Sequence, residues 1–169
     1  MTYLKSNANP LRLKEVLETS PAKQNNFSST STWYDVNYSS IEYTPRSITG
    51  KVIYEFNFWY GKDGSSGSNT INLNLKLLKN DGSGWADFGD DTHIFLGCVN
   101  DEKRSRSVYT ARFCLDNWGP TTLQLKLQGK RESGDIRLHN FIYFYDDSNT
   151  TESSEDRFYN PSVICYSLG

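Results

Sequence analysis

Residues 32–60, TWYDVNYSSIEYTPRSITGKVIYEFNFWY, are the stretch that decides the fold of this chain. They predict two extended segments joined by a turn, because Pro45 has no backbone N–H and suits the start of a strand better than its middle. Beyond Gly50 the apolar side chains recur at every second position, as they do on one face of a strand. These side chains are Val52, Tyr54, Phe56, Phe58 and Tyr60. A strand with this much apolar surface needs a second sheet to cover it.

The same alternation recurs further along the chain. Residues 71–77 read INLNLKL and residues 123–128 read LQLKLQ, which places the leucines inward and the Asn, Lys and Gln side chains outward. Other strands bounded by turn-forming residues are predicted over 93–99, 108–115, 136–145 and 162–168. A series of about eight or nine strands of this kind predicts an all-β domain over residues 32–169, an antiparallel, jelly-roll-like β-sandwich.

Residues 1–31 are predicted to form a short N-terminal arm and linker. The window 11–18, LRLKEVLE, places Leu13, Val16 and Leu17 on one side of a two-turn helix. A helix of this length is too short to be stable alone, and the QNNFSSTST that follows is polar and turn-prone. The apolar side predicts either docking on a partner chain or packing against the β-sandwich, and the pattern favours neither.

The composition argues against several classes of partner. The net charge is −2, with acids and bases interspersed, so no basic field predicts binding to nucleic acid. No run approaches the roughly 20 apolar residues that cross a bilayer. Residues 1–10, MTYLKSNANP, lack the apolar region of a signal peptide. We therefore expect no nucleic-acid ligand, no membrane insertion and no secretory signal.

The chain has three cysteines, Cys98, Cys114 and Cys165. Their odd number and the lack of C-x-x-C spacing argue against a disulfide framework or a zinc site. All three lie in apolar, strand-like contexts, where a free cysteine is usually a small buried hydrophobe. We expect buried free thiols.

Few residues could carry catalysis. The two histidines, His93 and His139, lie on different predicted strands, and no nucleophile, zinc-protease or phosphate-loop motif accompanies them. His139 is expected to pack at a surface or an interface. The acids Asp87, Asp90 and Asp91 could serve as a carboxylate pair or hold calcium near residues 80–91, but ordinary turn chemistry accounts for them without either. The sequence predicts a non-enzymatic protein with no cofactor and no metal.

Surface recognition is the more informative hypothesis. Trp85 and Trp118 lie in glycine-containing turns, where aromatic side chains are often displayed, and Asp87 follows the first of them. An exposed indole can stack on a sugar ring while neighbouring acids and amides bond its hydroxyls. The alternative is that each tryptophan folds back over one end of the sandwich or into a subunit interface.

Aromatic residues also predict self-association. Two strands are apolar on both sides, and an outward apolar face usually needs burial against another chain. The candidate interface residues are Tyr54, Phe56, Phe58, Trp59, Tyr143 and Tyr145.

The region from residue 31 to the C-terminus resembles a β-domain that recurs in phage virions, at the receptor-facing ends of tail fibres and in related appendages. The resemblance lies in a Trp-x-Asp-Val segment followed by a Thr-Pro-x-Ser turn and the start of a long strand. The matching residues are Trp33, Asp35, Val36, Thr44, Pro45, Ser47, Lys51 and Val52.

The resemblance implies a virion structural protein, a tail-fibre or appendage subunit, made in the host cytoplasm and located in the virion. It implies a homotrimer around a three-fold axis that contacts a glycan or protein of the host surface. Residues 1–31 would attach the subunit to other virion proteins. A monomeric carbohydrate-binding module is the alternative from another class, and a capsid decoration or head-fibre protein is a variant of the first hypothesis.

Overall fold

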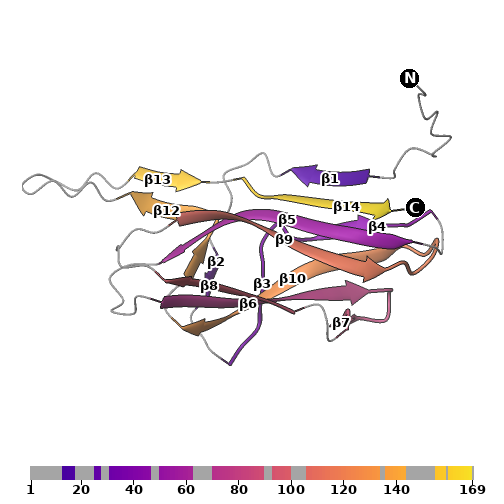
Figure 1. The fold of residues 1–169 in the computed structure, drawn as a ribbon, viewed down its shortest axis with the longest axis horizontal. Coiled ribbons are helices and arrows are strands. Elements are labelled where there is room, and N and C mark those ends of the chain that lie inside the picture. The colour runs from indigo at the N-terminus through magenta and orange to yellow at the C-terminus, as the bar shows by residue number, and fades with distance from the viewer. Residues whose placement is uncertain are drawn as a thin grey trace, which may run out of the picture.

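The computed structural model describes residues 13–17, 25–27, 31–46, 50–62, 70–89, 93–99, 106–133, 136–143, 155–158 and 160–168. These residues form fourteen strands and no helix. No helix long and apolar enough to cross a membrane occurs within these ranges. The strands are arranged in two six-stranded layers and a separate two-stranded hairpin, which confirms the expected antiparallel β-sandwich (Figure 1).

The first layer, the β5 sheet, is built on the longest strand, β5 (Lys51–Lys62). One side of β5 pairs along its length with β9 (Arg106–Asp116). The other side pairs first with β14 (Ser162–Leu168) and then with β11 (Ile136–Leu138). Two short strands therefore share one flank of β5, end to end.

The edge beyond these two strands comes from the N-terminal residues and corrects the helix predicted for this region. Leu13–Leu17 is strand β1, which pairs antiparallel with β14, and Asn25–Phe27 is strand β2, which pairs antiparallel with β11. A two-turn helix leaves most of its terminal backbone groups without intrahelical partners, whereas a five-residue strand on an existing edge pairs with a ready ladder. Tertiary pairing thus outweighs the local helical pattern.

The second layer, the β10 sheet, is centred on β10 (Leu123–Ser133) and β6 (Thr70–Asn80), which run antiparallel. The outer flank of β6 is again divided, between β8 (His93–Val99) and the short β7 (Trp85–Asp87). The strand predicted over 93–99 is confirmed by β8. In Figure 1 this layer lies below the one that contains β5, β9 and β14.

The outer flank of β10 carries β3 (Tyr34–Asp35) and β4 (Ile41–Tyr43). Between them Tyr38 adopts a left-handed backbone with φ 64°, and the buried Ser39 hydroxyl donates to the Val36 carbonyl at 2.7 Å. The same hydroxyl accepts from the Leu127 N–H at 3.0 Å, so this bend is fixed to the centre of the sheet.

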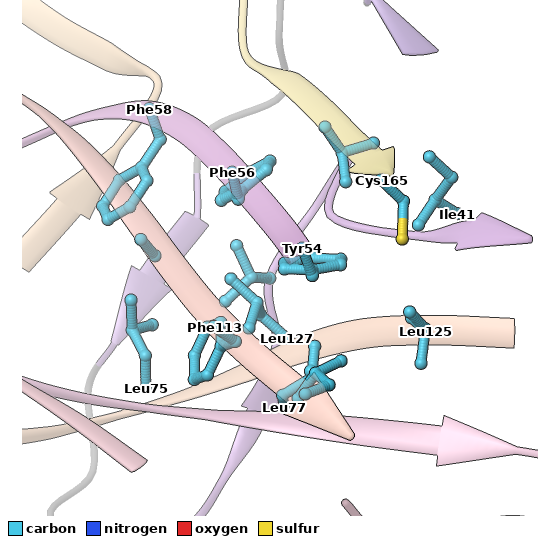
Figure 2. Close-up of a cluster of buried hydrophobic side chains, with 14 of the residues drawn as sticks. Ile41, Tyr54, Phe56, Phe58, Leu75, Leu77, Phe113, Leu125, Leu127 and Cys165 are labelled. Carbon is cyan, nitrogen blue, oxygen red and sulfur yellow. The ribbon is translucent and has the colours of Figure 1, made fainter. Parts of the chain in front are cut away.

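The core fills the space between the two layers. Figure 2 shows Tyr54, Phe56 and Phe58 pointing from β5 toward leucines of the opposite sheet, among them Leu75 and Leu127. All five side chains have no exposed surface. Each large side chain buried in this way contributes roughly 2–3 kcal/mol to folding. The leucines predicted to point inward on β6 and β10 are also buried, which confirms the period-two interpretation.

The long strand predicted over 136–145 is divided at His139. This residue has φ 68°, outside the strand region, and β12 (Asn140–Tyr143) leaves the layer to pair with β13 (Glu155–Phe158). His139 is fully buried, with its ring edge-on to Phe56 and Tyr38 at centroid distances of 5.9 Å. The expectation that His139 packs at a surface is therefore wrong.

The cysteines differ in their surroundings. Cys165 lies in the core, where burial raises the pKa of its thiol to about 12, so it is the buried free thiol that was expected. Cys114 is exposed on β9, so the expected burial is wrong for this residue, because the alternation along β9 turns it to the face opposite the core. Cys98 lies in β8, and its side chain is outside the described part of the chain.

Candidate recognition face

The outer surface of the β10 sheet carries a continuous set of polar side chains. Register places Lys76 of β6 opposite Gln128 of β10, and Asn74 opposite Lys130. Directly paired residues in an antiparallel ladder project on the same side of the sheet. Because the alternating leucines point inward, these amides and ammonium groups line the outer surface of the sheet. We call it the polar sheet face, and its polar and aromatic members are Trp33, Asp35, Glu42, Asn74, Lys76, Asn80, Trp85, Asp87, Gln124, Lys126, Gln128, Lys130 and Glu132. Leu78, in register with Lys126 and Asp87, lies on the same side and is buried.

Trp85 is held on this face by the turn that precedes β7. The Asn80 side-chain oxygen accepts from the N–H groups of Gly82 at 2.8 Å and Gly84 at 3.1 Å. Both glycines have strongly positive φ angles, 102° and 126°, which other residues rarely adopt. Trp85 is 40% exposed, and the Lys126 Nζ lies 4.3 Å from the centroid of its ring. The turn thus presents one aromatic ring to solvent with its orientation restrained by a cation–π contact.

Trp33 lies at the other end of the same surface. The Nζ atoms of Lys76 and Lys130 approach its ring to 4.8 Å and 5.1 Å from the centroid. Trp33 is half-buried, whereas Trp85 is exposed. The two tryptophans therefore flank a central area of lysine, acid and amide groups.

Every lysine of the polar sheet face is paired with a carboxylate. Lys126 lies 2.7 Å from Asp35, Lys76 lies 2.9 Å from Asp87, and Lys130 lies 3.1 Å from Glu132. The lysine side chains are only 15%, 14% and 22% exposed, whereas their acidic partners are 56%, 51% and 36% exposed. The lysine side chains are thus largely covered, and the acidic side chains expose a larger fraction of their surface.

Side-chain amides complete the hydrogen bonding on this surface. Gln128 donates to Asp35 at 2.9 Å, and Asn74 donates to Glu132 at 2.5 Å. Burial acts to raise the pKa of Asp35, but the hydrogen bonds from Lys126 and Gln128 outweigh it and hold that pKa below its ordinary value. Asp35 therefore stays an ionised acceptor at any ordinary pH.

The structure separates the residues predicted for recognition. Trp85 and Asp87 lie together on the polar sheet face, both exposed. Trp118 instead closes the end of the sandwich, edge-on to Phe88 at 5.6 Å and to Tyr43 at 6.1 Å. Its indole N–H donates to the Thr121 carbonyl at 2.9 Å. Trp118 therefore lies as the alternative to surface display predicts, folded back over one end of the sandwich.

The predicted interface residues are also divided. Tyr54, Phe56 and Phe58 lie in the core of this chain with no exposed surface, so the face they form is used within the subunit. Trp59 lies on the opposite, outer side of the β5 sheet and is partly exposed. Tyr143 belongs to β12, but its side chain lies outside the described residues, as does all of Tyr145.

The acidic turn considered for calcium uses its oxygens locally. Asp81 accepts from the Ser83 hydroxyl at 2.6 Å and from the Ser83 N–H at 3.0 Å, and these bonds lower the pKa of Asp81. Asp87 is paired with Lys76. Within the described ranges no three His, Cys, Asp or Glu side chains gather where they could share a metal ion. Asp90 and Asp91 lie outside those ranges.

Sequence reasoning missed Trp33 and the three lysine–carboxylate pairs as members of a surface. The alternation did place Lys76, Lys126 and Gln128 outward, and Trp33 stood out only as part of the Trp-x-Asp-Val segment. What the sequence lacks is the register between β6, β10 and β3, which brings these separate segments together.

Comparisons with known proteins assign no family. No protein-family model matches the chain, and no curated protein matches its sequence. Solved structures with a similar fold include the Eiger TNF of S. frugiperda, with a TM-score of 0.36, 8% identity, and coverage of 89% of this chain and 94% of that one. Infectious bursal disease virus, Gt strain, gives a TM-score of 0.38 at 7% identity, covering 94% of this chain and 38% of that one. The TmCBM61 complex with β-1,4-galactotriose gives a TM-score of 0.29 at 11% identity, covering 75% of this chain and 83% of that one. These likenesses concern the sandwich fold alone.

Proposed function

We propose that this protein is a non-enzymatic structural subunit of a phage virion, a tail-fibre or appendage protein, that binds host-surface carbohydrate through its polar sheet face. The observation that carries the recognition part is the exposed Trp85 beside the Lys126–Asp35 and Lys76–Asp87 pairs on the outer side of the β10 sheet.

This arrangement has the chemistry that a sugar ring requires. One face of a pyranose carries C–H groups that pack against an aromatic ring, while its edge carries hydroxyls that donate and accept hydrogen bonds. Trp85 supplies the apolar surface and keeps a polar N–H. Asp35 and Asp87 accept from hydroxyls, and the amides of Gln128 and Asn74 both donate and accept. Because strands rather than loops hold most of these groups, they need little reordering when a ligand binds.

The virion part of the proposal is supported by the sequence resemblance. Among the residues that carry the resemblance, Val36 and Val52 lie in the core. A third, Asp35, belongs to the polar sheet face. We also propose that the subunit is a trimer and that residues 1–31 attach it to other virion proteins. Several copies of a weak sugar site on one fibre would bind far more tightly than a single copy.

The proposal is tested by binding to an array of purified bacterial surface polysaccharides. The full chain should bind at least one polymer, and Trp85→Ala should weaken that binding about fivefold or more, since a lost aromatic contact is worth roughly 1 kcal/mol or more. Trp118→Phe is the matched control, because this indole caps the sandwich end and should leave binding unchanged. Equal losses in both variants, or no binding by the parent chain, would exclude the polar sheet face as a carbohydrate site.

A further inference from the structure

The ion pairs of the polar sheet face expose their acids more than their lysines. The Nζ atoms of the three lysines lie over tryptophan rings and beside carboxylates, and the lysine side-chain exposures are 15%, 14% and 22%. The paired acids Asp35 and Asp87 are 56% and 51% exposed. The acidic side chains therefore present more of their surface to an approaching ligand than the lysine side chains do.

An acidic polysaccharide fits this arrangement poorly. Its carboxylate, sulfate or phosphate groups would be repelled by the outward acids, and each lysine that could attract them already has a partner at 3.1 Å or closer. A polycation is attracted only weakly, because the three lysines offset three of the four acids and leave one net negative charge, that of Glu42 opposite Gln124. What remains is a dense set of hydrogen-bond acceptors and donors, which uncharged hydroxyls can satisfy.

The extent of the surface suits a chain of sugars rather than one sugar. Trp33 lies beside Lys76, and Trp85 pairs with Asn80, four residues further along β6. At about 3.3 Å per residue these two positions are about 13 Å apart along the strand. A glycan that lies along β6 and β10 would contact Trp85 and the central polar groups together.

We propose that the polar sheet face selects a neutral glycan, a hydroxyl-rich polysaccharide without uronate, sulfate or phosphate groups, and excludes acidic ones. In this assignment a sugar ring stacks on Trp85 and hydroxyls donate to Asp35 and Asp87. The inference rests on the proposed function, since it specifies the ligand class of the same site.

The test uses the full chain on an array of bacterial surface polysaccharides sorted into neutral chains and chains with acidic groups. We expect binding to neutral members only, with a change of less than about twofold between roughly 50 and 500 mM NaCl, because no net charge is neutralised. The double variant Asp35→Asn, Asp87→Asn should lose about tenfold on the neutral ligand and gain binding to acidic members, because it uncovers Lys126 and Lys76. Asp116→Asn removes an exposed carboxylate from the β5 sheet and should change neither affinity nor selectivity.

The outcomes separate the two proposals. Binding to acidic members that depends on Trp85 and falls steeply with salt would overturn the neutral assignment and leave the carbohydrate site standing. An absence of binding, or binding unaffected by Trp85→Ala, would overturn both. Thermal unfolding of each variant distinguishes a lost contact from a lost fold.

Discussion

Gly129 of β10 shows how closely the two layers meet near the N-terminal edge. A Cβ atom at this position would lie 2.7 Å from Cε1 and 2.9 Å from Cζ of the Phe27 ring, and 3.4 Å from Leu73. Phe27 is 1% exposed and also meets Tyr34 edge-on at 6.3 Å. The absence of a side chain on one central strand thus makes room for an aromatic ring from the edge of the opposite sheet.

We expect Gly129→Ala to lower the free energy of unfolding by roughly 1–3 kcal/mol, because the added methyl group overpacks a site with no room. Urea denaturation measures this change. Combining Gly129→Ala with Phe27→Leu should cost less than the sum of the two single changes, since the shorter side chain withdraws from the methyl group. An alanine variant as stable as the parent chain would show that the Phe27 ring can move aside.

His139 should make stability depend on pH. Burial lowers its pKa from 6.5 to about 4, with only the backbone of Asn37 opposing the shift. The folded chain therefore holds the imidazole neutral, whereas the unfolded chain takes up a proton as the pH falls below 6.5. The stability that the neutral His139 ring contributes to the folded chain is fully present above pH 6.5. It is lost progressively toward pH 4, where the free energy of unfolding is lower by about 3 kcal/mol.

The measurement is denaturant unfolding at several values between pH 7 and about pH 4. His139→Asn should be less stable at pH 7 but should show a flatter pH dependence, since asparagine tolerates the positive φ and does not titrate. If the free energy of unfolding falls equally steeply with pH in the parent chain and in His139→Asn, other groups cause the loss of stability.

At the scale of elements, the observed sandwich differs from the predicted one at its sheet edges, where two short strands share one flank of a longer strand. The long strands β5, β6, β9 and β10 could be predicted because their side chains alternate over many residues. Short edge strands such as β1 and β2 take their structure from the ladder beside them, and their own sequences carry little strand signal. The sequence also did not predict that the strand over 136–145 ends at His139, because apolar residues lie on both sides of this position.

Removing residues 1–30 should therefore destabilise the sandwich. The truncation exposes the backbone edges of β14 and β11 and leaves a void where Phe27 packs. Unpaired edges promote association, and a lost buried phenylalanine costs roughly 3–5 kcal/mol. We expect lower thermal stability and concentration-dependent aggregation, followed by light scattering during heating.

Phe27→Ala in the full chain is the comparison for this truncation. It should reproduce the loss of stability but not the aggregation, because β1 and β2 still cover the edges. A truncated chain that is as stable and as monodisperse as the full chain would mean that the two strands are dispensable.

At the scale of the whole molecule, the two outer faces have different characters. The polar sheet face could be predicted in part, since Trp85 and Asp87 lie on it. Its lysine–carboxylate pairs depend on the register of three separate strands, which no local pattern encodes. The outer face of the β5 sheet was harder to recognise, because its apolar residues Ile53 and Trp59 alternate with the polar Lys51, Glu55 and Asn57.

This outer face of the β5 sheet is where we expect subunits to meet. Trp59 pairs in register with Val108, which is 57% exposed, and Leu168 at the end of β14 is 43% exposed. Light scattering coupled to gel filtration should give three times the chain mass of 19.3 kDa. Val108→Asp should dissociate the assembly, because a carboxylate buried between subunits without a partner is strongly unfavourable, whereas Trp85→Ala on the other layer should not. A monomeric parent chain would remove the trimer from the proposal and leave the carbohydrate site as the property of a single module.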